Sequence, residues 1–366
     1  MQTNVRIVGP SLYELPIDCQ LTAPEIVLKE RYATRLDYVR TLCALLRGAG
    51  YEADIVFAAD NANDSEAIRR RDKYEKPNVR AFAFALCRVR ERVGGFLGFG
   101  GECRETFVGT EGRYSVYGAT AFADCDYFDP ETGTFGVVKP IQSDYVPREV
   151  TQLDVQVREN GAVDIDSRTR LWGPGVAAFR RKYSEILPED RERDYQSLVG
   201  SISMAASATS ELETDVKSYP AELTFSCFVP NYATVEGDTI SLSIHSLAEA
   251  LFPLTGSVRE SPLGIPATDA SETEVRVIFP EGYTEVEHLP DEFCFRNPLN
   301  ASTWCACTVR TELDTSGRLV VTVRRMVNRR KADMLDATYF QLLKDWNRLA
   351  TSRSSRTLSV RRVKVK

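Results

Sequence analysis

The sequence predicts an α+β protein made of two domains. Its 366 residues suggest two to three domains of about 150 residues each, and each domain would be large enough to bury a core. Residues 24–50 repeat apolar side chains at three- and four-residue steps, as an amphipathic helix does, and a short apolar segment follows directly. Beyond Pro220, alternating segments and turn residues dominate. We therefore expect a mixed domain over residues 1–147 and a β-rich, sandwich-like domain over residues 148–366.

The first domain is expected to contain one long helix and a small sheet. The helix over 24–50 should end at Gly48-Ala49-Gly50, because glycine commonly ends helices. Residues 81–89 alternate bulky and small side chains, as a strand with one buried face would. The other expected elements are a strand at 53–58, a polar helix or loop at 61–76, a glycine-rich turn at 93–101, and strands at 104–108 and 114–122. The glycine-rich turn is not followed by Lys-Ser or Lys-Thr, so it does not match a phosphate-binding loop.

The second domain is expected to be mostly strands, with a helical stretch inserted. Glu159-Asn160-Gly161 is a strong hairpin signal between two alternating segments, 152–157 and 162–171. Helices are predicted near 176–214, with an interruption at Pro188, and near 333–350. The expected strands are 222–229, 239–244, 274–279, 293–295, 302–312 and 319–326. The basic tail, 357–366, alternates valine with Arg and Lys, which is typical of a charged edge strand.

Composition excludes several classes of function. No apolar run approaches the roughly 18 to 20 residues that span a bilayer, so we expect no membrane span. The net charge of -6 gives no reason to expect a nucleic-acid partner. The chain has two histidines, His245 and His288. Any Cys-His or Ser-His mechanism, and any multi-histidine metal site, must therefore use one of these two residues.

The nine cysteines do not form a disulfide framework, because their number is odd and their spacing is irregular. Cys43 and Cys87 lie in apolar runs, where a reduced cysteine packs as a small hydrophobic residue. One set could in principle bind zinc: His288, Cys294, Cys305 and Cys307. Cys305 and Cys307 share one face of an alternating segment and the chain lacks a C-x2-C pair here, which favours buried packing over metal binding. We expect neither a metal nor another cofactor.

One segment resembles the core of the transglutaminase-like superfamily, which shares its architecture with papain-type cysteine proteases. The segment is ERYATRLDYVRTLCALLRGAG followed by YEADIVFA. In that family the nucleophilic cysteine begins a buried helix, an acidic residue follows two positions later, and the helix ends in a Leu-Leu-Arg-x-x-Gly phrase before a strand. Residues 45–50 match the phrase and Asp37 matches the acidic position. The nucleophile position falls on Arg35.

The same alignment implies that the catalytic triad is lost. The fold needs a thiolate at a helix N-terminus, where the helix dipole lowers its pKa, facing a histidine that an aspartate orients. The family's histidine position matches Phe84 and its acidic position falls near Thr110. An alternative register places Tyr114 at the histidine and Asp129 at the acid. The chain has no histidine before position 245, so neither register supplies one.

The resemblance extends into the second half of the chain. Phrases such as KYSEILPEDRERDYQSLVGSISMAA and SYPAELTFSCFVPNYATVEGD are similar to those of bacterial multidomain proteins of this type. In those proteins a β-rich domain precedes the transglutaminase-like domain, and another β-rich domain of unassigned function follows it. The resemblance therefore implies a chain that lacks the first domain and belongs to an extracytoplasmic protein. No signal peptide is visible in the first residues.

Three functions remain open from the sequence. The expected one is a non-catalytic transglutaminase-like scaffold or binding module, whose partner would be an unidentified protein, peptide or glycan. The second is a cysteine-dependent acyltransferase or peptidase with a non-standard site at Cys43, Cys87 or Cys103. The third is a peptide- or glycan-binding module that uses the vestigial cleft. Its candidate groove residues are Arg35, Asp37, Phe84 and Tyr114, with Tyr117, Trp172 and Trp304 as further aromatic candidates unless these pack into the cores.

Overall fold

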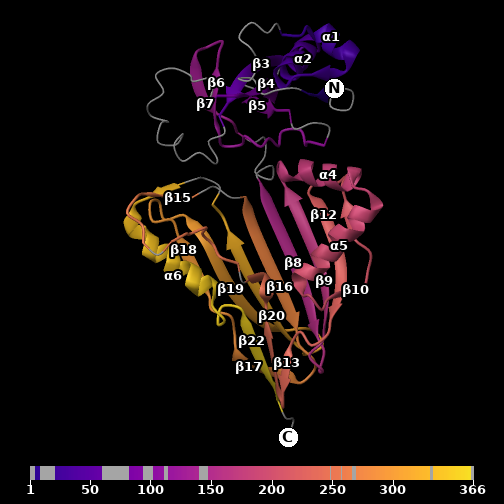
Figure 1. Cartoon of the computed structure of the whole chain (residues 1–366), viewed down its shortest axis with the longest axis vertical. Helices are drawn as coiled ribbons and strands as arrows, with labels where there is room; N and C mark the ends of the chain where they lie inside the picture. Colours follow the sequence, from indigo (N-terminus) through magenta and orange to yellow (C-terminus); the bar gives the residue numbers. More distant parts are fainter. Residues whose placement is uncertain are drawn as a thin grey trace. The chain divides into compact units, whose positions relative to one another are not determined.

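The computed structural model contains two compact units, which are described separately below. It describes residues 5–8, 21–59, 82–93, 102–110, 114–139, 147–247, 249–256, 258–265, 269–329 and 333–363. The first unit comprises Met1–Pro147 together with Trp172–Arg181, and the second comprises Arg148–Leu171 and Lys182–Lys366. In Figure 1 the first unit begins in indigo and the second ends in yellow. No helix of the described residues is long and apolar enough to cross a membrane.

The first unit is built on a five-stranded antiparallel sheet with the order β5-β4-β3-β6-β7. The strands are β3 Glu52–Ala58, β4 Phe84–Val93, β5 Glu102–Val108, β6 Asp126–Asp129 and β7 Thr134–Val137. Helix α2, Arg35–Gly48, packs on one face of this sheet through Val39 and Cys43, which meet Ala85 and Cys87 of β4. The expected strands at 53–58 and 104–108 are confirmed.

The segment 24–50 forms two helices instead of the expected single one. Helix α1, Pro24–Glu30, ends because Arg31 adopts a left-handed conformation with φ 61°. The two-residue strand β2, Tyr32–Ala33, then pairs in parallel with β1, Arg6–Ile7. Thr34 caps the new helix by accepting a hydrogen bond from the backbone N–H of Asp37, so α2 begins at Arg35. The apolar spacing continues across the break, which is why periodicity alone suggested one helix.

The expected strand at 114–122 is wrong, since this segment is a succession of turns. Gly118 has φ 81°, and a left-handed residue in the middle of the segment interrupts a strand. The strand that follows is β6, which pairs with the end of β3 through Phe57 opposite Phe128. The expected polar helix or loop at 61–76, and residues 94–101 of the glycine-rich turn, lie outside the described residues.

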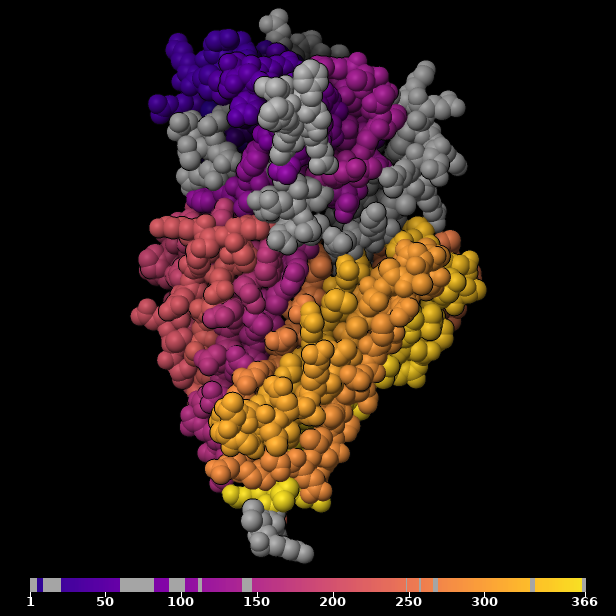
Figure 2. Space-filling model, turned by 180° about the vertical axis from the view of Figure 1, so that it is seen from behind, coloured from indigo at the N-terminus to yellow at the C-terminus, as the bar shows by residue number. Residues whose placement is uncertain are grey.

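The second unit contains a nine-stranded sheet with the order β10-β12-β9-β8-β16-β20-β19-β18, and with β11 also paired to β12. Strands β8 and β16 run parallel. A hairpin joins β8 to β9, as expected from Asn160-Gly161. In Figure 2 one face of this unit passes from salmon, the colour of residues near 200, through magenta, the colour of residues near 160, to orange, the colour of residues near 300. The strands are β8 Arg148–Val157, β9 Val163–Trp172, β10 Ser207–Ala208, β11 Glu213–Asp215, β12 Ala221–Val229, β16 Ala270–Ile278, β18 Phe293–Arg296, β19 Thr303–Leu313 and β20 Leu319–Val327.

A smaller, four-stranded sheet has the order β13-β14-β22-β17. Its strands are β13 Thr234–Glu236, β14 Thr239–Ser243, β17 Tyr283–His288 and β22 Thr357–Arg362. Strand β22 lies between β14 and β17, so the expectation that the basic tail forms an edge strand is wrong. Leu358 and Val360 are fully buried, and their burial favours the inner position. Arg361 and Arg362 form ion pairs with Glu287 and Glu159.

The helices of the second half are shorter than expected. The stretch 176–214 contains α4, Gly175–Glu185, and α5, Pro188–Ile202, which starts at the expected proline. The residues after α5 instead form β10 and β11, which pair with β12, because this Ser- and Thr-rich run favours extended backbone. The stretch 333–350 begins as strand β21, Asp333–Leu335, paired with β15, Leu263–Ile265, before helix α6, Phe340–Thr351.

Candidate functional site

Arg35 is the first residue of α2, at the position where the family resemblance places the nucleophile. Its side chain is exposed. A guanidinium keeps its proton at any physiological pH, so it supplies neither a nucleophilic electron pair nor a proton acceptor. The start of this helix therefore lacks the group on which cysteine-dependent acyl transfer depends.

Asp37 holds the start of α2 in place and does not face a groove. The side chain is 3% exposed. One carboxylate oxygen accepts the backbone N–H of Thr22 at 2.9 Å, and the other accepts the hydroxyl of Thr34 at 2.9 Å. The Thr34 oxygen in turn accepts the N–H of Asp37 at 3.2 Å, which completes a reciprocal helix cap. The expectation of Asp37 as a groove residue is thus replaced by a capping role.

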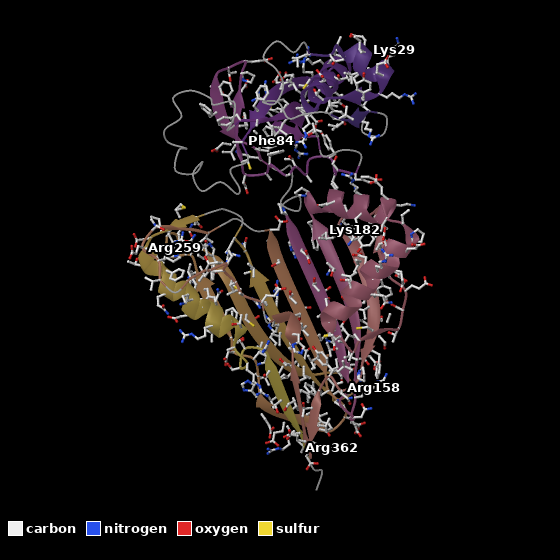
Figure 3. All side chains as sticks on the ribbon, in the orientation of Figure 1. Lys29, Phe84, Arg158, Lys182, Arg259 and Arg362 are labelled. Carbon is white, nitrogen blue, oxygen red and sulfur yellow. The ribbon has the colours of Figure 1, made fainter. Side chains whose placement is uncertain are left out.

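Phe84 lies on the face of the sheet opposite to α2. Side chains alternate along β4, and it is Ala85 and Cys87 that pack against the helix. Phe84, which is labelled in Figure 3, instead joins the cluster on the other face, and its ring centroid lies 4.8 Å from that of Phe122. Arg35 and Phe84 therefore do not converge on one cleft, which contradicts the register that aligned Phe84 with the histidine.

The remaining candidate positions of the first unit are scattered. Thr110 is half-buried and follows the end of β5. Tyr114 is half-buried within the turns, and Tyr117 is exposed. Asp129, the acid of the alternative register, is 1% exposed at the end of β6, and its carboxylate is occupied by the guanidinium of Arg88. Asp129 also accepts hydrogen bonds from the backbone N–H groups of Glu131 and Thr132.

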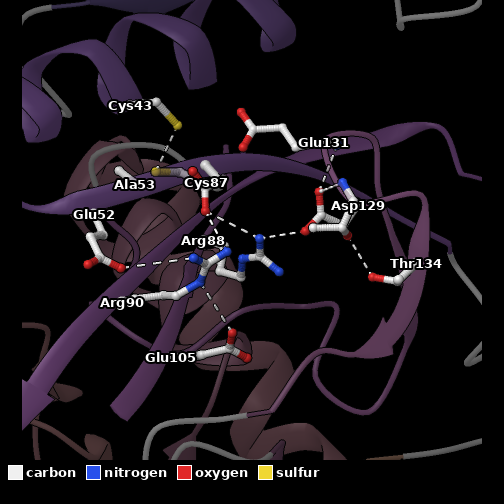
Figure 4. Close-up of polar contacts among 12 residues, drawn as sticks. Cys43, Glu52, Ala53, Cys87, Arg88, Arg90, Glu105, Asp129, Glu131 and Thr134 are labelled. Atoms are coloured by element: carbon white, nitrogen blue, oxygen red, sulfur yellow. Dashed lines mark hydrogen bonds and ion pairs between the residues drawn. The ribbon is translucent and has the colours of Figure 1, made fainter.

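The face of the sheet opposite to α2 carries an ion network that the sequence analysis missed (Figure 4). Its central cation is Arg88 of β4, which is 5% exposed and lies 2.6 Å from Asp129 and 3.2 Å from Asp54. Asp54 also pairs with Arg90 at 2.7 Å and with Arg47 of α2 at 3.3 Å. Arg88 is a charged residue inside an apolar strand, in the run FALCRVR, and this position could have indicated a buried ion pair from the sequence.

The pKa values within this network follow from its contacts. Burial alone would raise the pKa of Asp129, but hydrogen bonds from Arg88 and from the backbone amides of Glu131 and Thr132 outweigh it and lower the pKa. Burial alone would lower the pKa of Arg88, but its hydrogen bonds to Asp129, Tyr127 and Asp54 raise it. Both groups are therefore charged at neutral pH, and the network stabilises the sheet without offering a group for proton transfer.

Two cysteines of the first unit lie in contact inside the core. The Sγ atoms of Cys43 on α2 and Cys87 on β4 are 3.0 Å apart, and the residues are 2% and 0% exposed. The contact with Cys43 raises the pKa of Cys87, and burial raises it further. The expectation that both residues are buried in an apolar core is confirmed. Their burial leaves them closed to a substrate, whereas Cys103 on β5 is exposed.

The four residues suggested for zinc are not assembled into a site. Among the described residues, no group of three or more His, Cys, Asp or Glu side chains could hold a metal ion. Cys305 and Cys307 are buried, and burial raises the pKa of each to about 11. Cys294 is exposed, contrary to the expectation of packing. His288 lies at the end of β17 in the smaller sheet, where Nε2 is 3.3 Å from the carbonyl of Ser354.

Trp304 is not a groove residue, because it is 2% exposed in the core of the second unit. Its ring lies 5.8 Å from that of Phe252, which in turn lies 6.0 Å from that of Trp346 on α6. Trp172, at the end of β9, is half-buried. The aromatic side chains proposed for one groove are therefore distributed over different cores and surfaces.

The second unit contains a cavity of about 480 Å³. Its walls come from the large sheet, from α5, and from the end of β14 together with the residues that follow it. The apolar wall consists of Leu153, Val155, Ile165, Leu198, Ile202, Leu223, Phe225, Leu242, Ile244, Val275 and Val277. A volume of this size falls within the usual range of small-molecule sites.

The cavity changes from polar to apolar along the parallel pair β8 and β16. Successive inward-facing neighbours are Glu149 beside Ser271, Thr151 beside Thr273, Leu153 beside Val275 and Val155 beside Val277. This gradient could have been found in the sequence, since the alternation of β8 leads from Glu149 to Val157 by steps of two.

The charged residues that line the polar end of the cavity are acidic. Glu149 and Glu249 line it, and its described lining includes no Lys or Arg. Glu149 and Glu249 are both exposed, so this end of the cavity is open to solvent; partial desolvation of the Glu149 carboxylate raises its pKa, and the neighbouring carboxylates of Asp269 and Glu249 raise it further. His245 lies beside the ring of Tyr232 in a T-shaped contact with 6.0 Å between ring centroids.

Comparisons with known proteins add little to this geometry. No protein-family model matches the chain. No curated protein matches it. One similar solved structure is entitled "Crystal structure of a putative protease from Parabacteroides distasonis ATCC 8503". It shares 11% sequence identity with this chain, at a TM-score of 0.43, over 98% of this chain and 49% of that one. The chain thus spans about half the length of that protein.

Proposed function

We propose that the first unit is a non-catalytic scaffold of transglutaminase-like ancestry. The observation that supports this most is the arrangement around α2. The exposed Arg35 stands at the helix start, and the strand position aligned with the histidine belongs to Phe84, whose ring lies on the opposite face of the sheet. The residues of β4 that do face the helix include Ala85 and Cys87. Alanine has no ionisable group, and the raised pKa of Cys87 keeps its thiol protonated at neutral pH, so neither residue can act as a general base.

A turnover assay tests the proposal. The full chain is incubated with a glutamine-containing peptide and a fluorescent primary amine, and amine incorporation and ammonia release are measured with and without iodoacetamide. We expect rates equal to those of buffer, with no effect of alkylation. A Cys103→Ala variant serves as the control for the exposed thiol. Iodoacetamide-sensitive turnover that Cys103→Ala abolishes would instead establish a cysteine enzyme with a non-standard site.

The cavity of the second unit favours a binding role for that unit. We infer that it binds an amphipathic molecule with an apolar body and a cationic head group. The apolar wall would bury the body of the ligand, and the hydroxyl groups of Thr151, Thr273 and Ser271 would meet its polar end. A cation beside Glu149 and Glu249 would relieve the repulsion between their carboxylates.

Charge selectivity tests this binding role. Decyltrimethylammonium and decyl sulfate, both below their micelle-forming concentrations, are titrated into the full chain by calorimetry. We expect the cation to bind more tightly, by about tenfold or more, and Glu149→Gln to remove most of the difference. Asp154→Asn is the matched control, because Asp154 lies on the opposite face of the same strand. Equal affinity for the two amphiphiles, or an unchanged preference in Glu149→Gln, would contradict the assignment without affecting the proposal for the first unit.

A further inference from the structure

We propose that Cys43 and Cys87 form a disulfide bond that fastens α2 to the central part of the sheet in the first unit. The cysteines belong to elements that are 44 residues apart in the sequence, yet their Sγ atoms are 3.0 Å apart. A disulfide has an S–S distance of about 2.05 Å, so the two sulfur atoms need to approach by roughly 1 Å to form the bond.

The surroundings of the pair favour a structural bond over a reactive one. The two residues are 2% and 0% exposed, and they pack among Val39, Ala53 and Ala85. A thiol pair of a redox enzyme needs an accessible sulfur that exchanges with a partner. A buried disulfide, by contrast, is protected from reductants for as long as the helix stays docked.

The bond forms by thiol–disulfide exchange with a small disulfide such as oxidised glutathione. One cysteine thiolate attacks a sulfur of the oxidant and releases one molecule of glutathione, which takes up the thiol's proton. The second cysteine then attacks the mixed disulfide and releases a second molecule of glutathione. Both cysteine thiols are oxidised, and the oxidant is reduced to two thiols. Because both sulfur atoms are buried in the folded unit, we place this reaction before α2 docks on the sheet.

The proposed pairing is specific. Of the other described cysteines, Cys103 and Cys294 are exposed on strands, and Cys227, Cys305 and Cys307 belong to the second unit. Cys125 is 1% exposed in the first unit, but it lies in a segment on the β6 side of the sheet and is absent from the cluster that holds the pair. Closing a loop of this length restricts the unfolded chain, which is the main way in which a disulfide stabilises a fold.

Mass spectrometry of the refolded chain tests the pairing directly. The reduced, unfolded full chain is refolded in a mixture of reduced and oxidised glutathione, free thiols are alkylated, and the protein is digested without reduction. We expect one cross-linked peptide pair, which contains Cys43 and Cys87 and has lost two hydrogens, together with alkylated Cys103 and Cys125. Alkylation of both Cys43 and Cys87 under these conditions, or a cross-link between other cysteines, would overturn the proposal.

Thermal unfolding gives a second, independent measurement. Adding dithiothreitol during unfolding should lower the Tm of the first unit by roughly 5–10 °C, because the closed loop is released. A Cys43→Ala/Cys87→Ala double variant should show no such dependence, whereas Cys125→Ala should retain it. A Tm of the refolded wild-type chain that does not respond to dithiothreitol would contradict the proposed bond.

Discussion

Arg88 is the residue on which the first unit's ion network depends most. It is 5% exposed and joins Asp129 to Asp54, so its removal would leave a buried carboxylate without its cation. We expect Arg88→Met to lower the free energy of unfolding by about 3 kcal/mol. Arg90→Met is the matched control, because the Arg90 side chain lies on the same strand face, pairs with the same Asp54, and is 31% exposed. Its substitution should cost about 1 kcal/mol or less in urea unfolding, and equal costs for the two variants would contradict this assignment.

Asp129 makes the stability of this unit depend on pH in the acidic range. Its pKa in the folded state lies below the ordinary 3.8, so the folded protein binds the proton less readily than the unfolded chain. The resulting stabilisation is fully present above pH 3.8 and is lost as the pH falls through the lowered pKa. In urea unfolding, the difference between wild type and Asp129→Asn should therefore shrink from pH 6 to pH 2. A constant difference would show that the Asp129 charge does not contribute.

For single residues, the sequence predicts which residue stands at a given position of an element better than it predicts the face toward which the side chain points. Periodicity predicted one helix over 24–50, with Arg35 in its middle, whereas the family resemblance placed Arg35 at a helix start, and α2 does begin at Arg35. The alternation of β4 was also visible, but alternation does not say which of its two faces meets the helix. Only the packing of Ala85 and Cys87 against α2 shows that Phe84 points the other way.

At the scale of elements, breaks within periodic segments were the main features that the sequence did not reveal. The left-handed Arg31 ends α1 without a glycine, and the apolar pattern continues on both sides of it. In the same way, Asp336 caps a short 3₁₀ turn before α6, so the expected helix at 333–350 starts later. Strand β22 was read as an edge strand from its charges, although its neighbours are set by pairing partners distant in sequence.

Helix α6 offers a test of how a single side chain anchors an element. The side-chain oxygen of Asn347 accepts the backbone N–H groups of Leu251 and Phe252 at 2.9 Å each, and its amide donates to the carbonyl of Phe252 at 2.9 Å. Asn347→Ala would leave the backbone N–H groups of Leu251 and Phe252 without their acceptor, whereas the carbonyl of Phe252 still accepts the N–H of Leu254, and we expect a loss of about 2 kcal/mol in the free energy of unfolding. Asp345→Ala, at an exposed position of the same helix, should cost less than about 1 kcal/mol. Similar costs in chemical unfolding would show that the contacts of Asn347 do not anchor α6.

For the whole molecule, both histidines of the chain belong to the second unit. His245 lies at the cavity of this unit and His288 at the end of β17. The described part of the first unit contains a helix cap, a buried ion network and a buried cysteine pair. These contacts stabilise a fold, and the cavity in the other unit is the feature suited to binding. The β-rich character of the second half could be predicted from alternation, whereas the cavity depends on how the large sheet, α5 and the end of β14 meet.

The central claim, that the first unit forms no covalent intermediate, is tested most directly by intact-protein mass spectrometry in the presence of an activated acyl donor. The full chain is mixed with a p-nitrophenyl ester of an N-protected glutamine derivative and quenched in acid over a time course. We expect an unmodified mass, apart from slow labelling of the exposed Cys103 and Cys294, which a Cys103→Ala/Cys294→Ala double variant removes and which does not turn over. A rapidly formed acyl adduct on the first unit that is released by a primary amine would contradict it.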